Sequence, residues 1–199
     1  IDRVHAESRL GALLANYPDR KCSVYLLHGY MTPEEMTSLY QHEKIKSFVS
    51  LTHGEGFGLP LFEAAYNGLP IIAPNWSGHR DFLYAERKVK KNKKTIKKMT
   101  PCFLEVKHEL KQVQPSVVWD GVIIPESRWC YPKAESYRKQ LRSMLTSHRR
   151  HEKIANTLKD YILDNFSEQK MYNNFCDAVF APSDEEKTWI SNVSEIDIV

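Results

Sequence analysis

The chain has 199 residues, of which 42% are hydrophobic and 27% are charged, values that are ordinary for a globular domain able to bury a core. Its 28 Lys and Arg residues slightly outnumber its 25 Asp and Glu residues, and its four cysteines are scattered without a Cys-x-x-Cys pair. No apolar run approaches the ~20 residues that cross a bilayer, the N-terminus lacks a signal-peptide pattern, and no zinc site or disulfide framework is indicated. We therefore expect a cytoplasmic protein built around one main domain.

The first part of the chain alternates helical and strand patterns. Residues 3–16 predict a helix, and a second helix is expected to run to about residue 42, with Thr32 as its N-cap and Pro33 at its first position. Short apolar runs at 23–27, 48–51 and 71–73 predict buried strands of a parallel sheet with right-handed crossovers. This order predicts an α/β fold in which ligands bind beyond the carboxyl ends of the strands.

A glycine-rich turn follows the second of these runs and reads Glu55-Gly-Phe-Gly-Leu-Pro60. Glycine lets a backbone approach a phosphate closely, and the first N–H groups of the helix that follows have no partner inside that helix. Pro60 suits the first helical position and Gly68 suits the end. Glu55 and Glu63 could accept hydrogen bonds from hydroxyl groups on either side of an anion, as in a sugar–diphosphate–ribose ligand. The residue types alone fit a plain strand–helix junction equally well, with Glu63 placed favourably in the helix dipole.

A strongly basic segment follows the predicted sheet. Residues 87–98 contain eight basic residues and no acid, which leaves 20 basic against 25 acidic residues in the rest of the chain. Residues 85–100 are predicted to form a loop. The loop could be a solvated arm, or it could contact membrane phospholipid or a polyanionic acceptor through 87–98. Nucleic acid is not expected as a partner, because no aromatic residue is interleaved to stack on bases.

The last third of the chain predicts helices. Residues 102–107 and 116–119 fit strands, and three apolar stripes at helical spacing follow Pro132. We expect these stripes to be core contacts: Tyr137, Leu141, Met144 and Leu145; Ile154, Leu158, Tyr161 and Ile162; and Met171, Tyr172, Phe175 and Val179. His148 and His151 stand among arginines and are expected to be solvated, so no metal or cofactor is expected. The predicted domains are residues 1–131, which bind the ligand, and the helices of 132–199, which pack on them.

The turn and its helix resemble a known signature. Glu55-x7-Glu63 enclosing Gly-Phe-Gly-Leu-Pro, continued by Ala-Ala-Tyr-Asn-Gly-Leu-Pro, resembles the donor-site E-x7-E motif of GT-B glycosyltransferases, and most closely the retaining family 4. Upstream, residues 24–29 and 36–40 are similar to the segment that precedes this motif, so the resemblance spans about residues 22–84. It implies the C-terminal, donor-binding half of a GT-B fold, a Rossmann-like sheet flanked by helices. The start of that domain and the N-terminal acceptor-binding domain would be missing.

The resemblance also implies an activity and a set of site residues. The activity is metal-independent transfer of a hexose-like unit from a nucleotide-diphosphate sugar to a hydroxyl of a glycan, lipid or protein acceptor, with retained anomeric configuration. Glu55 would stand at the catalytic centre and hold donor-sugar hydroxyls, and Glu63 would accept hydrogen bonds from the ribose. The remaining implied contacts are the substrate-binding turn residues Gly56, Phe57, Gly58 and Leu59, and the base-binding residues Gly29, Tyr30 and Met31.

Two departures from the family pattern leave alternatives open. Trp76 is bulky where the family has a small loop, and Arg80 beside it suits an anion or a surface ion pair equally. The family's diphosphate-neutralising Arg and Lys have no match, so the isolated chain is expected to bind a donor weakly and could be inactive as a fragment. A non-catalytic nucleotide-sugar or glycan-binding module and a GT-B sugar-nucleotide epimerase are the alternative functions.

Overall fold

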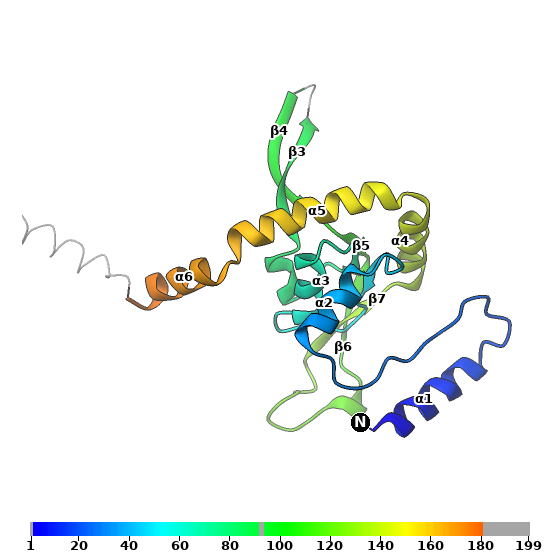
Figure 1. The fold of residues 1–199 in the computed structure, drawn as a ribbon. Helices are drawn as coiled ribbons and strands as arrows, with labels where there is room; N and C mark the ends of the chain where they lie inside the picture. Colours follow the sequence, from blue (N-terminus) through cyan, green and yellow to red (C-terminus); the bar gives the residue numbers. More distant parts are fainter. Residues whose placement is uncertain (1, 92–93, 181–199) are drawn as a thin grey trace, which may run out of the picture. The chain divides into compact units, whose positions relative to one another are not determined.

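The computed structural model describes residues 2–91 and 94–180 (Figure 1). The chain divides into two compact units, residues 1–39 and 40–199. The division falls inside helix α2 (Pro33–Gln41), whose last two residues belong to the second unit. The sheet and the glycine-rich turn both lie in the second unit, so the candidate site is built there.

A three-stranded parallel sheet forms the centre of the second unit. Its middle strand is buried along its whole length, as expected of a parallel strand that is covered on both faces. Within it, Ile72 lies opposite Val49 on one side and Leu104 on the other. The predicted α/β fold with a parallel sheet flanked by helices is therefore confirmed. In spatial order the strands are β1 (Phe48–Val49), β2 (Ile71–Pro74) and β5 (Leu104–Val106).

Helix α3 (Leu59–Tyr66) connects β1 to β2 and buries one face against the sheet. Its N-cap is Gly58, whose φ of +92° is a left-handed conformation that favours glycine. Pro60 takes the second helical position, one residue later than predicted. Gly68, at φ +75°, ends the helix as predicted, because its N–H and that of the next residue bond back to α3 carbonyls in a Schellman arrangement.

Two further helices cover the sheet and confirm the first two predicted stripes. Helix α4 (Ala134–Thr146) contacts β2 and β5, and its Met144 packs in one cluster with Ile72, Leu104 and Val106. Helix α5 (His148–Asn165) contacts α3 and buries three residues of its own. Leu145 was predicted to be core but is 76% exposed, because it lies one step off the buried face of α4.

The third predicted stripe is a helix but not a core. Helix α6 (Glu168–Phe180) forms where the pattern places it, yet none of its residues is buried. The four residues of the predicted stripe are between 40% and 63% exposed, which corrects the prediction of a core for Met171, Tyr172, Phe175 and Val179. An apolar period of 3.6 residues predicts a helix face but does not tell whether another element covers that face. Residues 181–199 of the predicted helical portion lie outside the described residues.

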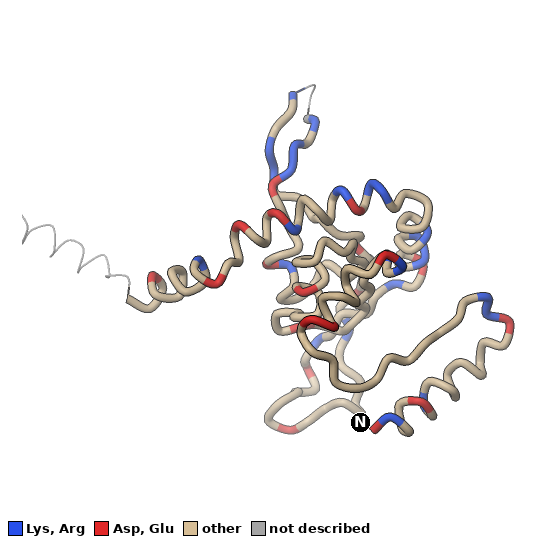
Figure 2. Tube along the Cα trace, viewed as in Figure 1, with Lys and Arg blue, Asp and Glu red and all other residues tan. Residues whose placement is uncertain are grey.

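Two antiparallel hairpins complete the second unit. The first pairs β3 (Tyr84–Lys91) with β4 (Lys94–Pro101) over eight registered residue pairs, so the prediction of a loop at 85–100 is wrong. Lysine has little strand preference, and the sequence contains no Gly or Pro between residues 85 and 100 to indicate a hairpin, so the pattern did not predict the strands. Figure 2 shows how densely Lys and Arg are placed along this hairpin. The second hairpin pairs β6 (His108–Gln112) with β7 (Arg128–Pro132) and was not predicted.

The predicted strand at 116–119 is also wrong. A 3-10 turn, η2 (Pro115–Val117), occupies its first part, and Trp119 makes only an isolated bridge to Ile123. A run of β-branched residues favours strand locally, but a strand forms only where a neighbour offers a continuous ladder.

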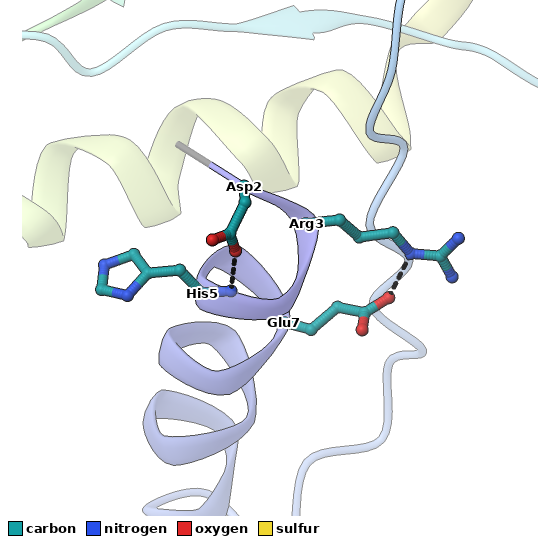
Figure 3. Close-up of polar contacts among 4 residues, drawn as sticks. All are labelled: Asp2, Arg3, His5 and Glu7. Carbon is teal, nitrogen blue, oxygen red and sulfur yellow. Dashed lines mark hydrogen bonds and ion pairs between the residues drawn. The ribbon is translucent and has the colours of Figure 1, made fainter.

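In the first unit, helix α1 (Arg3–Ala15) confirms the first predicted helix. The Asp2 carboxylate caps it by accepting a hydrogen bond from the His5 N–H at 2.7 Å, and an exposed ion pair joins Arg3 Nε to Glu7 Oε1 at 2.7 Å (Figure 3). The cap satisfies one of the unpaired N–H groups at the start of the helix. No residue of α1 is buried, so local bonds rather than packing define this helix.

The rest of the first unit confirms one prediction and corrects another. Thr32 caps α2 as predicted, since its Oγ1 accepts the Glu35 N–H while the Glu35 carboxylate accepts the Thr32 N–H, a capping box. Residues 23–27 were predicted as a strand but form none, and the large side chains among them are 42–89% exposed. A short apolar run carries no information about a pairing neighbour. Within the described ranges of both units, none of the helices combines the length and apolar character that a bilayer crossing requires.

Candidate functional site

The turn between β1 and α3 presents free backbone donors at the start of a helix. Gly58 is buried and left-handed, and α3 begins at the next residue. Among the described residues, no hydrogen bond is donated by the N–H groups of Phe57, Gly58 and Leu59. These are the three groups that the resemblance assigns to the diphosphate and sugar. Three free donors at the positive end of a helix dipole suit an anion.

A loop after β2 fixes the backbone of Glu55 from one side. The Ser77 hydroxyl donates to the Glu55 carbonyl at 2.6 Å and accepts from the Glu55 N–H at 3.1 Å. The N–H of Gly78 donates to the same carbonyl at 3.1 Å. Both polar groups of the Glu55 backbone are therefore satisfied by one short loop, and the turn is held in place before any ligand binds.

The approach of this loop to the turn leaves no room for a side chain at Gly78. A Cβ atom there would lie 1.8 Å from the carbonyl oxygen of Gly56 and 2.7 Å from its carbon. Ser77 stands at φ +74° and ψ −166°, a conformation that side chains rarely adopt and that costs on the order of 1–3 kcal/mol. Such strain persists only where neighbouring contacts enforce it, and here the Glu55 backbone supplies them.

Strand β7 holds the same segment from a second side. The N–H of Cys130 donates to the His53 carbonyl at 3.1 Å, and His53 Nδ1 lies 2.6 Å from the Cys130 carbonyl. Because a carbonyl only accepts, this nitrogen carries the proton. The His53 ring also stacks on Trp129 at 5.0 Å between centroids. The turn is thus tied to two strands far apart in sequence, β2 through its following loop and β7 directly.

Phe57 anchors the middle of the turn through its ring. The ring centroid lies 4.9 Å from that of Phe82 and 5.4 Å from that of Phe62, which is on α3. Phe82 is fully buried, so these contacts connect the turn to the core. The side chain of Phe57 serves packing, and its backbone N–H is the group left for a ligand.

Glu63 is held by a tyrosine that the sequence reasoning left without a role. The Tyr40 hydroxyl donates to Glu63 Oε2 at 3.1 Å, and only 7% of Tyr40 is exposed. Burial, together with the hydrogen bond to the carboxylate and its charge, raises the pKa of Tyr40 to about 12. Tyr40 therefore stays a donor at neutral pH. The only sequence signal for it was its place at the end of the Met36–Tyr40 segment.

The two carboxylates differ in their surroundings. Glu55 lines a cavity of about 360 Å³ at the carboxyl end of β1, together with Ser50, Leu51, Thr52 and Pro60. Glu63 is not among the residues that line this cavity, and its observed polar contact is with Tyr40. The structure thus places the first carboxylate on an open cavity and the second on the helix behind it, fixed by a hydrogen bond.

His79 lies buried against the turn. It is 2% exposed, and its Nε2 donates to the Pro74 carbonyl at 2.7 Å. Its Nδ1 is then a buried acceptor without a partner among the described residues. A Cβ at Gly58 would lie 3.2 Å from the His79 Cβ, so this ring packs directly beneath the start of α3.

Arg80 and Trp76 lie on an open face beside the same loop. Both line a cavity of about 610 Å³ with Asp81, Tyr84 and Met99. Arg80 is exposed and forms no ion pair with a carboxylate in the part of the chain that the structure describes. Its guanidinium is available to an anion that enters this cavity.

The predicted base-binding residues belong to the first unit. Gly29, Tyr30 and Met31 lie in the first unit, outside any helix or strand. Tyr30 is 88% exposed and Gly29 has φ +140°. Their role against a base remains a prediction.

Histidine and acidic side chains do not gather into a metal site. Within residues 2–91 and 94–180, no three His, Cys, Asp or Glu side chains come together in a way that could hold an ion. His148 and His151, predicted to be solvated, each have a hydrogen-bond partner. His148 Nε2 lies 3.1 Å from the Lys46 carbonyl and His151 Nε2 lies 3.0 Å from Ser143 Oγ.

Residues 24–98 match the family model described as "Glycosyl transferases group 1". The match covers fewer than half of the 199 residues, and it includes both carboxylates, the glycine-rich turn, α3 and β2. A comparison with curated proteins and one with solved structures each found nothing similar enough to report. The family match and the turn geometry together support a glycosyltransferase domain of the GT-B type in this part of the chain.

Proposed function

We propose that the chain binds the nucleotide-diphosphate sugar of a retaining glycosyltransferase and supplies the donor side of its active site. The observation that carries the proposal is the set of free N–H groups at Phe57, Gly58 and Leu59, on a turn fixed from two sides. The family match makes a glycosyl-transfer role the natural context for such an anion site.

The diphosphate is the anion that this turn suits best. The free N–H groups and the α3 dipole offer partial positive charge without a flexible side chain, so little order is lost on binding. Arg80, which lines the 610 Å³ cavity, is the one Lys or Arg in residues 75–81, the loop whose Ser77 bonds the Glu55 backbone. Fixed donors of this kind stabilise the charge that grows on a leaving diphosphate.

The carboxylates then bind alcohol groups on the two sides of the diphosphate. Glu55, on the 360 Å³ cavity, would accept hydrogen bonds from donor-sugar hydroxyls. Glu63 would accept them from the ribose through the carboxylate that Tyr40 orients. We assign Glu55 to substrate binding at the reaction centre and not to covalent attack.

The proposed reaction breaks the bond between the anomeric carbon and the diphosphate oxygen, forms a bond from that carbon to an acceptor hydroxyl oxygen, and transfers the proton of that hydroxyl to the leaving diphosphate. The anomeric configuration is retained, and the leaving diphosphate is stabilised by backbone N–H groups in place of a metal ion. The acceptor is a glycan, lipid or protein hydroxyl.

Calorimetric titration of the whole chain with UDP, GDP and ADP tests the donor site. We expect one of the three to bind, and Glu63→Ala to weaken it by about tenfold, the loss of a charged hydrogen bond. Glu135→Ala, which removes an exposed carboxylate on α4, is the matched control and should bind as the parent does. Failure of all three nucleotides to bind the parent chain would refute the proposal.

A 2′-deoxynucleoside diphosphate separates the ribose role of Glu63 from a structural role. If Glu63 holds the ribose, the deoxy ligand binds the parent chain more weakly, and the penalty disappears in Glu63→Ala. If the deoxy ligand lost the same amount of affinity in the parent chain and in Glu63→Ala, the ribose would not be bound by Glu63.

Product analysis tests the reaction itself. Incubation of the chain, combined with the acceptor-binding domain that the resemblance implies, with a nucleotide sugar and an acceptor should yield a glycoside of retained configuration. An isomerised nucleotide sugar would indicate an epimerase, and unchanged donor in the presence of tight binding would indicate a binding module.

A further inference from the structure

Most of the Lys and Arg side chains of the described β3–β4 hairpin have no carboxylate partner. Along the described part of the hairpin, Lys97 alone has a carboxylate partner, Glu86, at 3.2 Å, and that pair is exposed. Arg87 lies beside the buried thiol of Cys102 at the base of the hairpin. The remaining cations have no ion pair in the described structure: Lys88, Lys90, Lys94 and Lys98.

The register of the hairpin sets like charges opposite each other. Arg87 pairs directly with Lys98, and Lys88 pairs directly with Lys97. Residues directly opposite in an antiparallel pair share a face, so these two pairs put positive charge on both faces of the ribbon. Like charges in opposite positions destabilise a ladder, and a two-stranded hairpin has little stability of its own.

Apolar side chains stand between the cations. Val89 lies opposite Ile96, on the face that also carries Arg87 and Lys98. Ile96 is 38% exposed, and Met99 on the other face is 46% exposed. No aromatic residue occurs between residues 85 and 99, so the hairpin has nothing to stack on nucleic-acid bases.

We propose that the β3–β4 hairpin is a docking surface for an anionic phospholipid bilayer. Its lysines bind the headgroups, while Ile96, in the outer half of the hairpin, reaches the interface between headgroups and acyl chains. Lysine suits this arrangement because its long apolar stem can lie in the interface with the ammonium group in water.

The position of the charge favours a hairpin that meets the membrane end-on. Residues 1–86 and 99–180 together carry 19 basic and 20 acidic residues, so the positive excess that an anionic surface attracts lies in the hairpin. Strands rise about 3.3 Å per residue, so the outer end of β3 stands about 13 Å beyond Arg87, farther than the Debye length of about 8 Å at physiological salt. Figure 2 shows the basic segment extending away from the acidic residues of its base.

Vesicle sedimentation of the whole chain tests this surface. We expect binding to phosphatidylcholine vesicles that contain about 30% phosphatidylglycerol, no binding to phosphatidylcholine alone, and release as salt rises well above 0.1 M, about the range where screening removes surface attraction. The triple variant Lys88→Gln, Lys90→Gln, Lys98→Gln should bind on the order of 100-fold more weakly, about fivefold for each lysine.

A matched variant controls for net charge. Lys139→Gln, Arg142→Gln, Lys153→Gln removes three exposed cations from α4 and α5 and should bind vesicles as the parent does. Ile96→Ser should weaken vesicle binding with no change in net charge. Equal losses in both triple variants would show non-specific attraction and overturn the proposal. So would binding of duplex DNA or heparin that depends on the hairpin without vesicle binding.

Discussion

Two regions of the second unit, fewer than 30 residues apart in sequence, use polar groups in opposite ways. At the Glu55 turn, the backbone is bonded to Ser77 and Gly78, and three N–H groups remain free where a ligand would enter. Along the described β3–β4 hairpin, the two strands pair with each other over eight registered residue pairs, and most of its cationic side chains have no carboxylate partner. The first arrangement suits a small ligand of fixed shape, and the second suits an extended surface whose charges can adjust.

The largest effect is expected where the turn is tightest. Gly78→Ala should destabilise the chain by about 3 kcal/mol or more and abolish nucleotide binding, because the new methyl group would overlap the Gly56 carbonyl. Urea unfolding followed by circular dichroism measures the first effect, and calorimetry measures the second.

Gly56→Ala is the control for that substitution. A Cβ at Gly56 meets nothing within 4 Å, so the change should stay within about 1 kcal/mol of the parent. If the two alanine variants proved equally stable, the turn would not be as rigidly held as its geometry indicates.

A middle-sized effect is expected at Tyr40. Tyr40→Phe removes the hydroxyl that orients Glu63 and should cost about 1–2 kcal/mol of unfolding free energy, as for other hydrogen bonds to a charged group. Nucleotide affinity should fall with it. Tyr66→Phe, on the exposed side of α3, makes the same chemical change without a bonded partner and should leave both quantities unchanged. If Tyr40→Phe bound the nucleotide as tightly as the parent does, the hydrogen bond from Tyr40 to Glu63 would not contribute to ligand recognition.

A smaller effect of opposite sign is expected on the hairpin. Lys98→Glu converts the like-charge pair with Arg87 into an opposite-charge pair and should stabilise the chain by about 0.5 kcal/mol or less. Hydrogen exchange should show hairpin amides beyond Arg87 exchanging much faster than those of β2. Protection of both sets to the same degree would mean that the hairpin is held by contacts other than its ladder.

The smallest effect is expected at His151 on α5, a basic group that is partly buried, in contrast to the solvated lysines of the hairpin. Burial, aided by the neighbouring charges of Arg150 and His148, lowers its pKa below the usual 6.5. Below pH 6.5 the unfolded chain therefore binds more protons than the folded one, so this contribution to stability is present above that pH and is lost as the pH falls. The melting temperature of His151→Asn should fall less than that of the parent between about pH 7.5 and 5.5. Equal slopes would contradict the assignment.

Local rules predicted the elements that depend on local chemistry. Thr32 caps α2 as expected, and Gly68 ends α3 at the expected residue. The short apolar run that became β2 was found because a strand covered on both faces is apolar throughout. The run at 48–51 gave only the two-residue strand β1, neither residue of which is buried. For the site, the sequence indicated the glycine-rich turn and both carboxylates.

Contacts between distant segments could not be predicted. Ser77 and Gly78 meet the turn more than 20 residues away, and no local pattern shows a loop that approaches another backbone so closely. The β3–β4 hairpin was not predicted, because its many lysines hide the alternation of apolar and polar residues that indicates a strand. A strand was wrongly predicted at 23–27, because an apolar run does not show whether a neighbouring strand is present to pair with it. The role of Tyr40 could not be predicted either, because its hydroxyl bonds to Glu63, a residue 23 positions away.

The Ser77 hydroxyl joins the proposed donor site to the loop that leaves β2, a strand with all of its residues in the core. On heating, the anion-binding turn should therefore have no melting transition of its own, and its occupancy should vanish only when the whole unit unfolds. In the described residues of the β3–β4 hairpin beyond Arg87, no side chain makes a hydrogen bond or ion pair to the three-stranded sheet or to the loop after β2. A temperature range should exist in which the chain still holds a nucleotide yet has already released a lipid surface.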